Sequence, residues 1–537
     1  MSGMIGKFAV CASLAVGGSL FAADWGRAPN GEFWNGSAQR FIYAPAFGFR
    51  EIAGATNYEF EVTDDYHRTH RFCAPEPTAS LASVWDSLPV GYVTVVVRGN
   101  GCGIAADDCA GRRTFWKKAA FNGGRYAPAK CSYALASRRI YDYFLRLPQT
   151  RHLLEKGFPD MGYPLNGYPT KMLSAEIGAM LNFRHSLDAH ANNDGSRQDA
   201  LAIARTAADF LISGSVPEGQ ALAFLPRTYA SEGSEYGRFK GEQDTIMMNY
   251  PATAGAAFLS LYSETKDARY LDAAERIARV YLKLQGDDGT WPLKLNAVTG
   301  AVLSANRLVP IPVISFLEKA HSSTGRGEYR AAADRAFGFL ERGPMRDWDW
   351  EGQFEDVKPA ERRWSNLTKH PACSVAMYLL KRFPGDAERL AQAEELVKFS
   401  EDQFVEWEPP YDNGRHADGA GEDDGTWDYF CRPYSKWATP CVLEQYSCYY
   451  PIDSSAVKLI ETYLALWRVT HKEGYLARAK ALGDTATRMQ EPDGFVSTWW
   501  VKGVNRHDDR YHVWLNCMLG TARALDGLSR AERQRRN

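Results

Sequence analysis

The side chains that could do chemistry gather just before a set of apolar helical segments. Five of these segments carry proline at or near their start, in the pairs Tyr168-Pro169, Tyr250-Pro251, Val309-Pro310, His370-Pro371 and Tyr450-Pro451. Proline suits the first turn of a helix because its missing N–H would have no helical partner there. It does not explain the tyrosines and the histidine beside it, which are side chains that can donate or accept a proton.

Tyr250 and His370 are therefore the acid–base candidates at these helix starts. The substrate-binding candidates at the same places are Tyr168, Asn249, Arg307, Lys369, Tyr450, Arg510 and His512. A capping or packing role would explain any single one of them, and Asp453 fits a plain N-cap. That role explains the whole set less well, because repeated caps do not need tyrosine, histidine and arginine.

A second group of candidates lies in the long loops between the helical segments. Glu355, Asp428 and Glu444 each stand near an aromatic residue in these loops. Glycoside hydrolysis typically uses two carboxyl groups across the scissile bond, one as acid and one as base or nucleophile. A ring beside a carboxyl group can hold a sugar and can raise the pKa of the acid by desolvation. Most carboxylates in acidic loops are solvated surface groups. These three are the best catalytic candidates in the loops because an aromatic residue stands near each of them.

Aromatic residues in the loops could form the walls of a sugar-binding cleft. The stacking candidates are Trp291 in DDGTWPL, Trp499 in FVSTWW and Tyr446 near Glu444. Aromatic residues make up 13% of the chain, and a large packed core explains that content as well. The acidic run GEDDG lacks the spacing of an EF-hand, so no metal or cofactor is predicted.

The helical segments that carry these candidates fall into two alternating sets. One set is rich in Ala, Gly and Leu and should be buried, and its starts recur at intervals of 59 to 82 residues. The other set is amphipathic with a charged outer face, as in EYRAAADRAFGFLER. Six buried helices alternating with six amphipathic ones predict an (α/α)6 toroid over residues 126–537. An open solenoid is the alternative, but six units favour closure. The buried helices then start at one rim.

The chain before the toroid has a different pattern. Residues 1–23 read as a signal peptide, with one Lys before a short apolar run that ends in Phe-Ala-Ala. Residues 24–125 contain alternating or β-branched runs, such as NYEFEVTDD and GYVTVVVRG. These runs predict a small β-sandwich of immunoglobulin or fibronectin type III kind. We expect this domain to be a spacer or a wall for the toroid, with an independent binding module as the alternative.

Charge and hydropathy limit the partners and the location. The formal net charge is −2, which argues against a nucleic-acid binder driven by bulk charge. After the signal peptide no stretch reaches the roughly 18 apolar residues of a membrane span. We expect a periplasmic or secreted protein whose partner is a polysaccharide or oligosaccharide substrate. The oligomeric state stays open.

The β domain, the repeated hairpins and the aromatic Asp-Gly turns together resemble the six-hairpin glycosidase superfamily. The resemblance covers roughly residues 130–527 and is architectural. It implies an (α/α)6 toroid and activity on carbohydrates, although polysaccharide lyases and glucuronyl C5-epimerases use a similar toroid. No motif identifies one family, so the resemblance assigns no catalytic residue in this chain.

Three functions are consistent with these patterns. The leading prediction is a secreted glycoside hydrolase, which the loop carboxylates favour. The second is a lyase or C5-epimerase for a uronate-containing polymer, with Tyr250 or Tyr450 and His370 as base and acid. The cations at the helix starts would then neutralise the uronate carboxylate, which helps to remove the neighbouring proton. The third is a non-catalytic glycan-binding protein.

Overall fold

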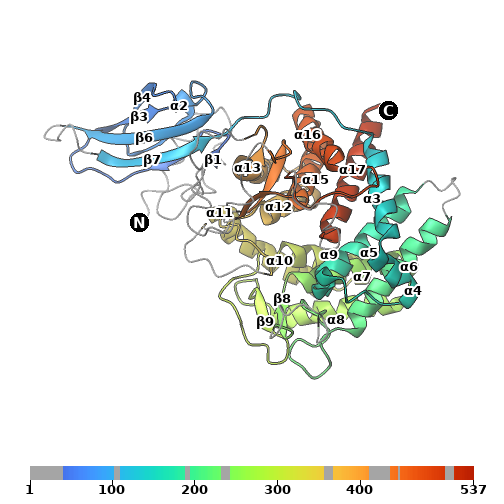
Figure 1. Cartoon of the computed structure of the whole chain (residues 1–537). Coiled ribbons are helices and arrows are strands. Elements are labelled where there is room, and N and C mark those ends of the chain that lie inside the picture. Colours follow the sequence, from blue (N-terminus) through green and yellow to red (C-terminus); the bar gives the residue numbers. More distant parts are fainter. Residues whose placement is uncertain are drawn as a thin grey trace.

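The computed structural model of the chain describes residues 40–101, 109–187, 194–230, 242–355, 364, 367–409, 436–445, 448–501 and 513–536. In these ranges a small β domain stands beside a ring of helices (Figure 1). Strand β1 (Arg40–Phe41) of the β domain contacts helix α13 (Ala387–Phe404) of the ring. The predicted fold class, a mainly α toroid preceded by a small β domain, is confirmed.

The β domain is built on one five-stranded sheet with the order β1-β7-β6-β3-β4. Strand β1 runs parallel to β7, and the other neighbours are antiparallel. A separate antiparallel pair, β2–β5, and the short helix α2 complete the domain. The remaining bounds are β2 Ala46–Gly48, β3 Asn57–Thr63, β4 Thr69–Ala74, β5 Thr78–Ser80, α2 Ala82–Trp85, β6 Gly91–Asn100 and β7 Cys109–Lys117.

One face of the five-stranded sheet is buried. In β6, Val93, Val95 and Val97 are buried while the residues between them are partly exposed, as the two-residue period of a strand requires. Phe47 of β2 covers this face, with its ring centroid 5.3 Å from that of Phe115 in β7. The expected sandwich of immunoglobulin kind would have a second full sheet. Among the described residues the second layer is instead a two-stranded ribbon.

The helical domain is a closed ring of six inner and six outer helices among the described residues. The inner helices are α5 Pro169–Ser186, α7 Tyr250–Thr265, α9 Ile311–Thr324, α12 Lys369–Arg382, α15 Asp453–Thr470 and α17 Leu515–Arg536. The outer helices are α3 Tyr133–Arg146, α6 Asp194–Ser213, α8 Ala268–Leu284, α10 Gly327–Arg342, α13 and α16 Glu473–Met489. Each inner helix packs against its inner neighbours, and α17 contacts both α5 and α3. The last helix thus closes on the first ones, so the toroid rather than the solenoid is confirmed.

Packing explains why the two sets of helices alternate. Outer helix α8 buries Tyr270, Ala274, Ile277 and Tyr281, which recur every three or four residues and form one stripe. Inner helices are flanked by helices on several sides and are buried almost all round. At Gly255 of α7 a Cβ would lie 2.4 Å from the Phe316 ring of α9, so the glycine lets these two helices approach closely.

Short helices and strands lie in the connections that lead to the starts of the inner helices. They are α4 Pro148–Lys156, η3 Pro164–Gly167, β8 Thr245–Met247, β9 Lys294–Asn296, α11 Pro344–Asp347, β10 Val405–Glu406, β11 Cys441–Gln445 and β12 Cys448–Pro451. Strands β10, β11 and β12 form one antiparallel sheet. No helix of the described part of the chain is long and apolar enough to cross a membrane.

Candidate functional site

Glu355 joins three elements at the rim where the inner helices begin. Its Oε1 pairs with the ammonium of Lys171 in α5 at 2.6 Å, and its Oε2 accepts a hydrogen bond from the Tyr250 hydroxyl of α7. Its backbone carbonyl accepts a hydrogen bond from Nζ of Lys294 in β9 at 2.6 Å. A loop carboxylate is therefore held in place by side chains from two inner helices.

These contacts fix the charge of Glu355. Burial alone would raise the pKa of this carboxyl group, but the charge of Lys171 and the hydrogen bonds from Lys171 and Tyr250 outweigh burial. The pKa of Glu355 is held below its usual value. The group is an anion at neutral pH, which is the state of a base or a nucleophile.

Aromatic rings line the approach to Lys171. Its ammonium lies 4.0 Å from the ring centroid of Trp514, a cation–π contact. The Trp514 ring lies 5.5 Å from that of Tyr168, and Tyr168 lies 5.7 Å from Tyr229. Two of these rings, Trp514 and Tyr168, thus lie directly beside the lysine that holds Glu355.

His370 lies in the first turn of α12. Burial lowers its pKa well below the usual value, and the charges of nearby lysines act in the same direction. These lysines are Lys369, Lys458 and Lys171. Its Nδ1 atom is buried without a hydrogen-bond partner in the described part of the chain. His370 is therefore a neutral imidazole with one ring nitrogen not engaged there.

Asp453, at the start of α15, carries a second perturbed carboxyl group. It is 0% exposed, and its Oδ2 has no hydrogen-bond partner among the described residues. Burial, together with the negative charge of Glu444, raises its pKa well above the usual value, although hydrogen bonds from Ser454 and Cys517 oppose this. Its surroundings therefore favour the protonated form of Asp453.

Glu444 lies in β11, beside Asp453 and α12. Its backbone carbonyl accepts a hydrogen bond from Nζ of Lys369 and a longer one, 3.4 Å, from the Thr368 hydroxyl. Its side chain is half-buried. The charge of Lys171 also acts on Cys517, whose thiol hydrogen-bonds Asp453. Lys171 thus lies close to Glu355 and to the neighbour of Asp453.

The structure brings several of the predicted residues together. Glu355, Tyr250, His370, Lys369, Glu444 and Tyr168 contribute to the arrangement described above. Asn249 lies next to it, since its Nδ2 donates to the carbonyl of Gln353 at 3.0 Å in the loop that carries Glu355. Trp499 is half-buried and forms a bridge with Ile452, directly before Asp453.

Two predicted binding residues have other surroundings. Trp291 is 0% exposed, its indole N–H donates to the carbonyl of Tyr281 at 3.0 Å, and its ring packs edge-on against that tyrosine. The stacking prediction for Trp291 is corrected, because both ring faces lie in the core. Arg307 forms an ion pair with Asp288 of the turn after α8 rather than with Glu355.

Other predicted residues lie outside what the structure describes. These are Asp428, Tyr446, Arg510 and His512, and for Tyr450 only the backbone in β12 is described. Sequence reasoning missed Lys171 and Trp514, and it interpreted Asp453 as a residue that fits a plain N-cap. Lys171 follows Pro169 by two residues, so an extended search of the first helical turns would have included it. Among the described residues no cluster of His, Cys, Asp and Glu is arranged to hold a metal ion.

Known structures share this fold. A D-mannose isomerase superposes with a TM-score of 0.50 at 10% identity, over 73% of this chain and 96% of that one. A family 76 glycoside hydrolase from a bovine Bacteroides thetaiotaomicron strain gives 0.47 at 11% identity, over 90% and 96%. The cellobiose 2-epimerase of Spirochaeta thermophila gives 0.46 at 11% identity, over 68% and 88%. No protein-family model and no curated protein matches the sequence. At these identities the likeness shows the fold alone.

Proposed function

We propose that the chain is a carbohydrate-active enzyme that hydrolyses glycosidic bonds in a polysaccharide or oligosaccharide, outside the cytoplasm. The observation that carries the proposal is a pair of carboxyl groups at one rim whose surroundings shift their pKa values in opposite directions. Lys171, at 2.6 Å, lowers the pKa of Glu355, whereas burial raises the pKa of Asp453. Carboxyl groups whose surroundings push their pKa values apart are the usual source of a base and an acid.

In this proposal Glu355 activates water or attacks the anomeric carbon. The proton for the leaving group comes from the second carboxyl pair, Glu444 and Asp453. Asp453 is the member whose pKa burial raises, and Glu444 is the member with exposed surface. The half-buried ring of Trp514, beside Lys171, offers a surface against which a pyranose could pack. A D-mannose isomerase with the same fold, at a TM-score of 0.50, supports a carbohydrate as the ligand.

A second candidate function is a lyase or C5-epimerase for uronate-containing polymers. The neutral His370 with its unengaged Nδ1 favours this function, because a neutral imidazole can accept a proton from carbon. The Tyr250 hydroxyl could then return a proton, and the lysines near His370 could neutralise the uronate carboxylate.

One experiment separates these functions. The full chain is incubated with a panel of neutral and acidic polysaccharides, and new reducing ends are measured together with the ultraviolet absorbance of unsaturated uronates. New reducing ends without that absorbance support the hydrolase, and both signals together support the lyase. Deuterium uptake at uronate C5 without cleavage supports the epimerase. Binding of a glycan with no turnover of any kind would establish the glycan-binding protein instead.

A further inference from the structure

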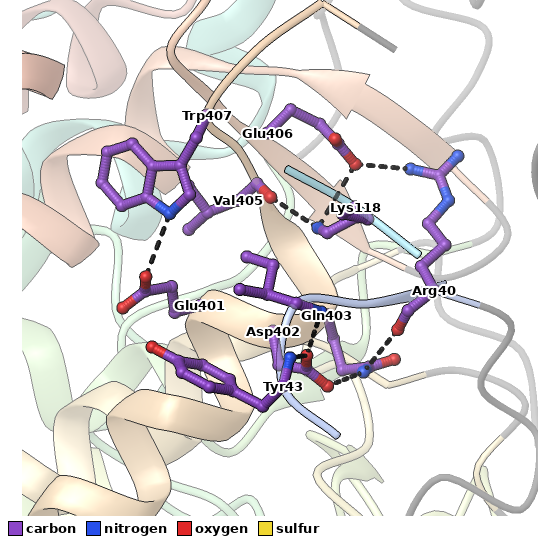
Figure 2. Close-up of polar contacts among 10 residues, drawn as sticks. Arg40, Tyr43, Lys118, Glu401, Asp402, Gln403, Val405, Glu406 and Trp407 are labelled. Carbon is purple, nitrogen blue, oxygen red and sulfur yellow. Dashed lines mark hydrogen bonds and ion pairs between the residues drawn. The ribbon is translucent and has the colours of Figure 1, made fainter. Parts of the chain in front are cut away.

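The face that the β domain presents to the toroid contains an ion cluster that is almost fully shielded from water. Arg40 of β1 and Lys118, directly after β7, are 3% and 2% exposed, and Glu406 of β10 is 4% exposed. Oε1 of Glu406 lies 3.1 Å from Nη1 of Arg40 and 3.3 Å from Nζ of Lys118. Figure 2 shows both cations, from the β domain, converging on this one carboxylate of the toroid.

A second set of contacts lies next to this cluster. Oδ1 of Asp402, at the end of α13, accepts hydrogen bonds from the backbone N–H groups of Ile42 and Tyr43. Gln403 donates to the carbonyl of Arg40 at 3.0 Å (Figure 2). Charged and amide groups buried in this way are costly unless they are paired. The pairing therefore specifies one position of the β domain against residues 402–406.

The segment that the β domain holds leads directly to the candidate site. Lys118 also donates to the backbone carbonyl of Val405, so both residues of β10 are engaged. In the sheet, Val405 pairs with Val442 and Glu406 pairs with Cys441 of β11. Glu444 follows Val442 by two residues in β11, and its backbone carbonyl accepts a hydrogen bond from the ammonium of Lys369.

The same sheet also reaches the second carboxyl group. Strand β11 pairs with β12, with Leu443 opposite Pro451. Strand β12 runs into Ile452, the N-cap of α15, and then Asp453. A one-residue shift of β10 would therefore displace the strand that carries Glu444 and the backbone that leads to Asp453, because register in a sheet is shared between neighbours.

We infer that Lys118 and Arg40 are positioning residues for the reaction proposed above. Through Glu406 they hold β10, and hence β11 with Glu444, in the register that the site needs. The β domain is then a working part of the enzyme rather than a spacer or a separate binding module. This inference rests on the proposed function for its kinetic half, while its structural half stands independently of any activity.

The test uses Lys118→Met in the full chain, because methionine keeps the length and apolar character of the side chain and removes the charge. Arg71→Met is the matched control, since Arg71 of β4 forms an exposed ion pair with Glu61 within the β domain itself. Hydrogen–deuterium exchange is measured on peptides that cover residues 436–445, with peptides from α7 and α9 as internal references. We expect faster exchange in β11 of Lys118→Met, with α7 and α9 unchanged, and no difference in Arg71→Met.

Kinetics on a glycan that the wild type cleaves supply the second readout. We expect kcat to fall about tenfold or more in Lys118→Met with little change in KM, because small misplacements of reacting groups affect the chemical step. Lys118→Arg, which keeps the charge, should recover most of the loss. If Lys118→Met is not obtained folded, Glu406→Gln, which keeps the shape of the carboxylate, is measured in the same two ways.

The two halves fail separately. Unchanged exchange in β11, or exchange that rises equally throughout the toroid, overturns the positioning role whatever the activity. Faster exchange in β11 with unaltered kcat overturns it as well, because the site would then not depend on the strand. If the wild type turns over no glycan, the proposed function fails, and the local loosening of β11 alone decides whether the β domain holds that strand.

Discussion

Tyr250 and Glu355, which are 105 positions apart in the sequence, share a hydrogen bond in which the tyrosine hydroxyl donates to Oε2 of the carboxylate. Oε1 of the same carboxylate accepts a hydrogen bond from Nζ of Lys171 at 2.6 Å. Both oxygens are thus engaged before any substrate arrives. A water or an anomeric carbon would approach the lone pairs that these two donors leave free, so the two contacts help to orient the reacting group.

Replacing Glu355 should remove activity and keep substrate binding. We expect Glu355→Gln to lower kcat by about 10²- to 10⁴-fold, since a neutral amide cannot act as base or nucleophile. Unfolding should become easier by about 1–3 kcal/mol, because Lys171 loses its charged partner. Steady-state kinetics, calorimetric binding and thermal melts measure the three effects. Glu318→Gln, which removes another ion-paired carboxylate of an inner helix, should keep wild-type kcat. Equal losses in both variants would contradict a catalytic Glu355.

Replacing Lys171 should move the acidic limb of the pH–rate profile. Burial raises the pKa of Glu355 and Lys171 lowers it below its usual value. In Lys171→Met burial dominates, so the folded pKa rises. The base acts only when it is ionised. As the solution is acidified, Lys171→Met should therefore lose activity at a higher pH than the wild type does. A profile of kcat/KM against pH measures this shift.

The same substitution should change how stability depends on pH. A carboxyl group with a depressed folded pKa stabilises the protein above its unfolded pKa, and that contribution is lost as pH falls through the folded pKa. Lys171→Met should remove this contribution, so its melting temperature should gain less than that of the wild type between acid and neutral pH. Lys319→Met, at a half-buried lysine of α9 that donates to Ala256, is the control. If the acidic limb of the kcat/KM profile of Lys171→Met stays at the wild-type pH, the Lys171–Glu355 coupling is disproved.

Substrates with different leaving groups can show whether Asp453 or Glu444 is the general acid. A general acid is needed for a poor leaving group and is nearly dispensable for an activated aryl glycoside. The variant that removes the true acid, Asp453→Asn or Glu444→Gln, should lose activity on the natural glycan and regain most of it on the aryl substrate. The alkaline limb of its pH profile should also disappear, because that limb reports loss of the acid's proton. If neither variant recovers, the acid lies elsewhere in the chain.

The architecture of the ring follows from patterns that one sequence contains. The stripe of Tyr270, Ala274, Ile277 and Tyr281 marks α8 as amphipathic, and Pro251 marks the start of α7, because these signals depend on neighbours in sequence. Six such units are enough to predict closure. The sheet β10-β11-β12 was not predicted, since its strands are short and β10 lies far from β11 in the sequence.

The chemistry of the site is less accessible to sequence reasoning. Lys171 differs from other lysines only because the ring brings it to Glu355, 184 positions away. Trp291 shows the opposite error, since a tryptophan in an Asp-Gly turn looks the same whether it stacks on sugar or fills the core. Only the packed structure shows its indole bonded to Tyr281. Burial and distant charges are tertiary properties, and they decide which groups are acids and which are bases.

Tyr250→Phe and His370→Gln together distinguish hydrolysis from proton abstraction. If the enzyme is a hydrolase, the Tyr250 hydroxyl only assists Glu355. Tyr250→Phe should then lower kcat modestly, by about tenfold or less, and move the acidic limb to higher pH, because one hydrogen bond to the ionised carboxylate is lost. His370→Gln should likewise retain measurable turnover.

If the enzyme is a lyase or epimerase, both side chains carry protons in the reaction, and each variant should lose about 10²-fold or more of its activity. Reducing-end formation, uronate absorbance and deuterium uptake on one glycan measure all three chemistries. Loss of every signal in both variants, with glycan binding intact, would decide against the hydrolase and assign the proton transfers to Tyr250 and His370.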